Sequence, residues 1–169
     1  QDVSGSQGPV VGPAAIAGWT VARAVSLIPE AQVAMVTFGS SVKPVMWPRQ
    51  APPGVPELTA PDGYEMPSTA IRALDGALHL TQPGFARLLF MATDAEFVQK
   101  TEAVNAITDV QRLLKAGCKV IWLATGSGIS GSYRQNAMLQ PGVIRIDVSG
   151  SPDNIAQIIA DAVVRAMKE

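Results

Sequence analysis

Four short, almost wholly apolar segments place the strongest limit on the fold of this 169-residue chain. They are residues 31–38 (AQVAMVTF), 87–93 (RLLFMAT), 118–125 (CKVIWLAT) and 142–148 (GVIRIDV). Each has the length of a β-strand and contains β-branched or aromatic residues. Because polar and apolar residues do not alternate in them, both faces of these strands should be covered, as in a parallel sheet.

Helical patterns lie between and around these strands. Apolar residues recur at helical spacing over residues 14–28, 70–80, 98–116 and 155–166. Gly117 follows the third pattern, where a glycine commonly ends a helix. The alternation predicts an α/β fold, doubly wound, with a mostly parallel central sheet and helices on both faces. We expect a single domain that spans the chain.

A proline-rich segment interrupts this alternation. Residues 44–67 hold seven of the thirteen prolines in the chain, and such a segment forms neither a helix nor a central strand. We expect an exposed, extended loop that begins with a short edge strand at residues 42–47. A loop of this length in a compact domain is often functional, although a proline-rich connection without a function is an equally good explanation.

Composition argues against several classes of partner. Hydrophobic residues make up 47% of the chain and charged residues 16%, and the net charge is −1. With no basic stripe and no apolar run of about 20 residues, the sequence predicts neither a nucleic-acid partner nor a membrane partner. The lone cysteine, Cys118, cannot form an internal disulfide, which favours a reducing, cytoplasmic compartment.

The pentapeptide DVSGS concentrates oxygen-bearing side chains and occurs twice, at residues 2–6 and at residues 147–151. In the first copy Asp2, Ser4 and Ser6 are spaced two apart, so a tight loop can turn them toward one point. Hard cations such as Mg²⁺ bind oxygen ligands and keep some of their waters, whereas zinc prefers cysteine and histidine. The first copy is therefore a candidate Mg²⁺ site.

Two further oxygen ligands can join it, because ligands in α/β folds collect beyond the C-terminal ends of the strands. Thr69 opens the predicted helix after the proline-rich loop, and Asp94 directly follows the strand at residues 87–93. A D-x-S-x-S loop, a threonine that opens a helix and a strand that ends in Thr-Asp occur here in this order. In this the chain resembles the von Willebrand factor A (VWA) domain family over essentially its whole length.

The resemblance implies a metal-ion-dependent adhesion site. In the family the two serines and the threonine contact Mg²⁺ directly and the aspartates act mainly through water, which assigns these roles to Ser4, Ser6 and Thr69 and to Asp2 and Asp94. Mn²⁺ or Ca²⁺ also suits such ligands. Because the direct ligands are neutral, the ion keeps much of its charge and one position stays open for an incoming carboxylate.

The function that this implies is that of a non-enzymatic protein-binding module whose ion binds an acidic residue of a partner protein. In soluble bacterial and viral members the resemblance often implies work beside a MoxR-type AAA+ ATPase, or as a domain of a larger assembly.

Two departures from the family pattern stand out. Ala95 follows Asp94 where the family normally has glycine, which predicts a different turn geometry. The family's first strand, at the centre of the sheet, runs directly into the D-x-S-x-S loop, yet only Gln1 precedes Asp2. The first central strand is thus apparently missing from the chain. We expect a longer parent chain, because each buried backbone group left unpaired costs roughly 1–3 kcal/mol.

Other interpretations remain open. Aspartate and serine also serve turns and helix caps, so the domain can keep its fold as a structural piece that has lost its ion. Gly126, Gly128 and Gly131, with Asp147 beyond them, mimic a dinucleotide-binding fingerprint, so a nucleotide-binding enzyme that uses this loop is a further alternative. Residues 132–140 leave little room for the crossover helix that such a site needs.

The second DVSGS has a structural explanation. Ser151 is a candidate N-cap for the last predicted helix, with Pro152 at its first position. In the family's strand order this copy lies three strand positions, or about 14 Å, from the missing strand. The two copies therefore cannot share one ion.

Overall fold

The computed structural model describes residues 1–50, 54–125 and 137–147, and four positions near the end of the chain, residues 157, 158, 161 and 164. Its helices and strands are the 3₁₀ turn η1 (Gly5–Gln7), α1 (Val11–Ser26), β1 (Met35–Phe38), β2 (Val42–Met46), α2 (Pro67–Leu78), β3 (Leu88–Thr93), α3 (Lys100–Lys115), β4 (Lys119–Ala124) and β5 (Val143–Asp147). All four predicted strands, the edge strand and the first three helices are confirmed, although β5 is only half-buried. The last predicted helix, its candidate cap at Ser151 and the loop with Gly126, Gly128 and Gly131 lie mainly or wholly outside the described residues.

The strands form two sheets. β3, β4 and β5 pair in parallel, in that order, and β1 pairs with β2 as an antiparallel hairpin. The hairpin accounts for the edge strand within the proline-rich segment, because a tight turn joins antiparallel neighbours, whereas parallel neighbours need a crossover. The α/β class with a parallel sheet is therefore confirmed.

Residues 1–3 lie between the two sheets. The Asp2 N–H donates to the Ala92 carbonyl of β3 at 3.0 Å, and the Phe38 N–H of β1 donates to the Gln1 carbonyl at 2.9 Å. Asp2 and Phe38 form a parallel bridge. The strand order is thus β2, β1, residues 1–3, β3, β4 and β5. Among the described residues no strand is assigned between β1 and β3, so three residues hold the place expected for the central strand.

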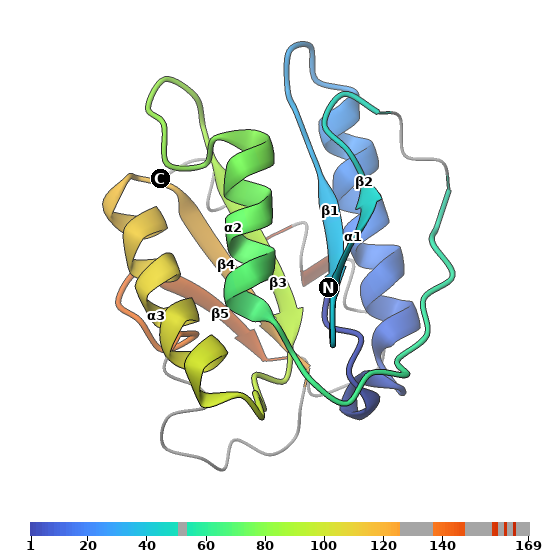
Figure 1. Cartoon of the computed structure of the whole chain (residues 1–169). Coiled ribbons are helices and arrows are strands. Elements are labelled where there is room, and N and C mark those ends of the chain that lie inside the picture. The colour runs from blue at the N-terminus through green and yellow to red at the C-terminus, as the bar shows by residue number, and fades with distance from the viewer. Residues whose placement is uncertain (51–53, 126–136, 148–156, 159–160, 162–163, 165–169) are drawn as a thin grey trace.

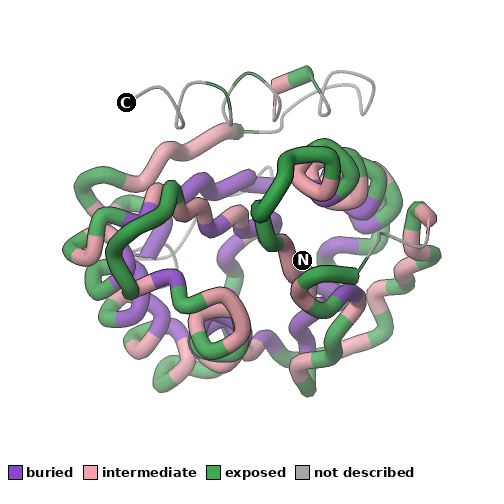
Figure 2. Tube along the Cα trace, turned by 90° about the horizontal axis from the view of Figure 1, so that it is seen from above, coloured by how far each residue is buried: buried purple, intermediate pink, exposed green. Residues whose placement is uncertain are grey.

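Helices cover both faces of this arrangement (Figure 1). On one face α2 and α3 pack over a cluster that includes Phe38, Leu89, Met91 and Trp122. On the other face α1 contributes a smaller cluster with Ala92 and Leu123. Figure 2 shows the buried residues concentrated in the strands between these helices. The predicted helices on both faces are confirmed.

The proline-rich segment returns to the first DVSGS after residue 53. The Gly5 N–H donates to the Asp62 carbonyl at 2.8 Å, and the Asp62 N–H donates to the Val3 carbonyl at 3.3 Å. The Asp62 side chain packs against Gly39, where an added Cβ would lie 2.2 Å from the Asp62 carboxylate, so this close approach requires glycine. The loop is therefore fixed along the edge that carries the candidate ligands.

Candidate metal site at the strand ends

The predicted ligands come from three elements that meet at one end of the molecule. The D-x-S-x-S loop leaves residues 1–3, Asp94 follows β3, and Thr69 lies in the first turn of α2. In Figure 1 the strands of the parallel sheet run toward the lower edge, where η1 lies and α2 begins. This is the C-terminal end of the strands, where α/β folds place their ligands.

Asp2 is fully buried, and both of its carboxylate oxygens have a donor. The Thr93 hydroxyl donates to Oδ2 at 2.6 Å, and the Ser4 N–H donates to Oδ1 at 2.8 Å. Burial raises the pKa of Asp2, the hydrogen bonds from Thr93 and Ser4 oppose that effect, and the nearby charge of Asp94 raises the pKa further. The fold therefore holds this carboxylate in one orientation at a cost in desolvation.

The two serines of the loop face each other. Their Oγ atoms are 3.2 Å apart, with Ser4 buried and Ser6 exposed at the rim. The next residue, Gln7, is buried and accepts a hydrogen bond from the Thr125 hydroxyl at 2.6 Å, which ties η1 to the end of β4. The loop thus presents two hydroxyl oxygens at one point on a fixed base.

Asp94 lies in a tight turn at the end of β3. Its Oδ1 accepts the Glu96 N–H at 3.0 Å, and the Ala95 N–H donates to the Thr93 hydroxyl at 3.0 Å. Ala95 has a φ of 59°, in the left-handed region that favours glycine. The alanine that replaces the family's usual glycine therefore sits in a strained turn.

Thr69 is engaged elsewhere. Its hydroxyl donates to Glu102 of α3 at 3.1 Å, and its N–H donates to the same carboxylate at 3.2 Å. In the described part of the chain, none of its hydrogen bonds is to Asp2, Ser4, Ser6 or Asp94. The structure thus joins Asp2, Ser4 and Ser6 by hydrogen bonds and places Asp94 next to Thr93, whose hydroxyl binds Asp2, whereas Thr69 is bound to α3.

Glu65, which the sequence analysis did not single out, belongs to this group. Its side chain is buried, and its Oε2 accepts the Val98 N–H at 2.9 Å. Burial raises its pKa, hydrogen bonding from Val98 and Ser4 lowers it, and the charges of Asp2 and Asp94 raise it. A glutamate in a proline-rich loop is ordinarily solvated, so no signal in the sequence marks this one as buried.

Three acidic side chains thus concentrate negative charge at this edge. None of the ion pairs among the described residues involves Asp2, Glu65 or Asp94. No three acidic, histidine or cysteine side chains in the described ranges are grouped so that they could hold an ion between them. An ion here would therefore also need the serine hydroxyls and water, a ligand set that fits Mg²⁺ better than zinc.

The second DVSGS lies apart from this edge. Asp147 ends β5, three positions along the sheet from residues 1–3, and its exposed carboxylate accepts hydrogen bonds from Arg145. The predicted separation of the two copies by three strand positions is thus found. Residues 148–151 lie outside the described residues.

Two solved structures share this arrangement. A von Willebrand factor type A structure from Catenulispora acidiphila matches with a TM-score of 0.70 and 16% identity, over 98% of this chain and 41% of that one. An aerotolerance-related membrane protein from Bacteroides fragilis, with multiple mutations to serine, matches with a TM-score of 0.64 and 16% identity, over 99% of this chain and 96% of that one. No protein-family model and no curated protein matches the sequence.

The chain therefore has a VWA-like fold. It spans less than half of the Catenulispora acidiphila structure. No helix within the described residues is long and apolar enough to cross a membrane.

Proposed function

We propose that this chain is a non-enzymatic protein-binding module in which a Mg²⁺ ion at the strand ends attracts an acidic residue of a partner protein. The observation that carries the proposal is the buried Asp2 carboxylate, oriented by Thr93 and Ser4 beside the facing hydroxyls of Ser4 and Ser6. These hydrogen bonds offset only part of the cost of burying the charge, since burial still raises the pKa of Asp2, and a cation would offset more of it. The VWA-like fold supports the same interpretation.

Each residue has a distinct task in this proposal. Ser4 and Ser6 would hold the ion through their hydroxyl oxygens, and Asp2 and Asp94 would hold its water ligands. When bound, the ion supplies positive charge at an exposed edge, which is what an incoming carboxylate needs. Mn²⁺ or Ca²⁺ can take the same oxygen ligands.

The identity of the partner belongs to the proposal too. A MoxR-type AAA+ ATPase, or the rest of a larger assembly, is the partner that the family resemblance suggests, in the cytoplasm. The proline-rich segment borders the site through Asp62 and would shape what can approach it.

A second candidate is a domain that keeps the fold as a structural piece without the ion. The observation in its favour is the hydroxyl of Thr69, which is bound to Glu102. Calorimetric titration with Mg²⁺ separates the two candidates. The proposal predicts that Asp94→Ala weakens Mg²⁺ binding by roughly tenfold or more, because it removes a carboxylate that holds the ion's waters.

The matched control is Asp147→Ala, which removes an exposed aspartate at the end of another strand. It should leave Mg²⁺ affinity unchanged. An acidic peptide, titrated in Mg²⁺ and in chelator, should bind only in Mg²⁺. A wild-type protein that takes up no Mg²⁺ at millimolar concentration would rule out the ion-bridge proposal in favour of the structural domain.

A further inference from the structure

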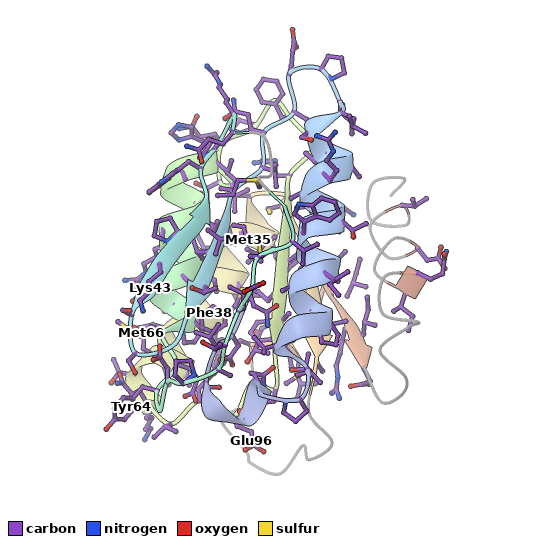
Figure 3. All side chains as sticks on the ribbon, turned by 90° about the vertical axis from the view of Figure 1, so that its right-hand side faces the viewer. Met35, Phe38, Lys43, Tyr64, Met66 and Glu96 are labelled. Atoms are coloured by element: carbon purple, nitrogen blue, oxygen red, sulfur yellow. The ribbon has the colours of Figure 1, made fainter. Side chains whose placement is uncertain are left out.

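Glu65 lies on the short segment that leads from the loop at Ser4 to α2. This segment starts at Asp62, which pairs with the loop at Ser4, and runs directly into α2. Figure 3 shows Tyr64 and Glu96 near the same end of the molecule, beyond Phe38 of β1. The backbone pairing at Asp62 thus brings the segment that carries Glu65 to the end of the molecule where Ser4 lies.

The Glu65 side chain points into the molecule. Only 4% of the residue is exposed, whereas its neighbour Tyr64 is 51% exposed. One carboxylate oxygen is held by the Val98 N–H. Hydrogen bonding from the Ser4 side chain acts on the Asp2 carboxylate and on the Glu65 carboxylate. Ser4 therefore lies near two acidic groups, Asp2 and Glu65.

Thr69 has the opposite surroundings. Its hydroxyl and its N–H both bond to Glu102, which also accepts the Ser68 N–H at 3.0 Å. This carboxylate fills the role of an N-terminal cap for α2, because Met66 at the N-cap position makes no side-chain capping bond. Moving Thr69 toward the ion would break a working helix cap.

We propose that Glu65, and not Thr69, is the side chain that faces the ion across from Ser4 and Ser6. This inference rests on the ion site of the proposed function and changes its chemistry. A carboxylate adds a negative charge where the family pattern has a neutral hydroxyl. The ion is then bound more tightly and keeps less charge for an external acid, so Glu65 competes with the carboxylate of the partner.

Titration with Mn²⁺, followed by the EPR signal of the free ion, tests this assignment. Glu65→Gln keeps the size of the side chain and an acceptor for the Val98 N–H but removes the charge. It should weaken Mn²⁺ binding by roughly tenfold or more. Thr69→Val keeps the shape of threonine without the hydroxyl. Its affinity for Mn²⁺ should stay within about twofold of the wild type, since the free energy of ion binding that is lost should be smaller than that of a typical hydrogen bond.

A matched control is Glu96→Gln, which removes an exposed carboxylate at the same edge and should leave Mn²⁺ affinity unchanged. A second measurement, the affinity for an acidic peptide, should change in the opposite direction. On protein saturated with Mn²⁺, Glu65→Gln should bind a glutamate-containing peptide several-fold more tightly than the wild type, because the ion keeps more of its charge. A purely structural role for Glu65 would not produce that gain. If Glu65→Gln does not fold, Glu65→Asp draws the carboxylate back by one methylene and should also weaken Mn²⁺ binding.

The outcomes separate this inference from the proposed function. Strong Mn²⁺ binding that is lost in Thr69→Val and kept in Glu65→Gln would overturn the assignment of Glu65 and leave the ion-bridge proposal standing. A wild-type protein that binds no Mn²⁺ would overturn both.

Discussion

Ala95 occupies a backbone conformation that suits glycine, in the turn that orients Asp94. Its φ of 59° costs an L-amino acid about 1–2 kcal/mol. Burial of its methyl group stabilises the folded chain by about 0.8 kcal/mol. The strain and the packing therefore nearly cancel at this position.

We predict that Ala95→Gly changes the free energy of unfolding by less than about 1 kcal/mol, because relief of strain offsets the lost methyl group. Ala106→Gly, at a buried position inside α3, should cost about 2 kcal/mol, since helix propensity and burial are both lost there. Urea unfolding of the two variants makes the comparison. Equal losses at the two positions would show that the turn at Ala95 is not strained.

The site was only partly predictable at this scale. Asp2, Ser4, Ser6 and Asp94 stand out because their spacing and their places at strand ends are local features of the sequence. Glu65 does not, since its burial depends on the pairing of the proline-rich segment with the loop at Ser4, which nothing in the local sequence specifies. The bond of Thr69 to Glu102 joins residues 33 positions apart, so it is equally invisible to local patterns.

The helices α2 and α3 are joined by a polar network at the element scale. The Ser68 hydroxyl donates to the buried Asp109 carboxylate at 2.6 Å, and Arg72 Nε donates to it at 3.0 Å. Arg112 of α3 lies 3.6 Å from the same carboxylate and also pairs with Asp75. Because Asp109 accepts from Ser68 and Arg72 and also pairs with Arg112, it should carry more of the stability than any one of these partners.

We predict that Asp109→Ala lowers the free energy of unfolding by about 2–3 kcal/mol, because it leaves the buried Ser68 hydroxyl without its acceptor. Ser68→Ala should cost only about 1 kcal/mol, since Asp109 keeps its arginine partners. Urea unfolding of the single variants gives both values. A loss in Ser68→Ala as large as that in Asp109→Ala would contradict this asymmetry.

The elements themselves followed well from the sequence where the signal was local. The four apolar runs became strands, and β3 and β4 are mostly buried, as a continuous apolar segment predicts, whereas β5 is only half-buried. The start of α2 was predicted at residues 69–70 and lies at Pro67. The backbone N–H groups at its start are capped by Glu102 on another helix, so no capping residue in the local sequence marks where α2 begins.

The whole molecule is joined across its centre by few residues. The hairpin of β1 and β2 and the sheet of β3, β4 and β5 meet through residues 1–3, and the Asp2 side chain adds a bond to Thr93. The same carboxylate that would serve the ion therefore also connects the two sheets. Ion binding and global stability should be linked for this reason.

This linkage has a definite sign. Burial raises the pKa of Asp2 and of Glu65, so both carboxyls bind a proton more tightly in the folded chain than in the unfolded one. Without an ion, their contribution to the free energy of unfolding therefore falls as the pH rises from the ordinary range of these acids, about pH 4, through the raised pKa. Asp2→Asn cannot titrate at this position and should show a flatter dependence on pH.

Mg²⁺ should reverse this trend, because it binds the ionised carboxylates and its affinity rises as they lose their protons. Ion present at about 100 times its dissociation constant stabilises the folded chain by about 2.7 kcal/mol. We predict that urea unfolding in chelator shows stability falling as the pH rises above about 4, and that saturating Mg²⁺ abolishes or inverts the fall in the wild type only. Parallel curves for the wild type and Asp2→Asn, with and without Mg²⁺, would show that the carboxylate at the junction of the two sheets is not where the ion acts.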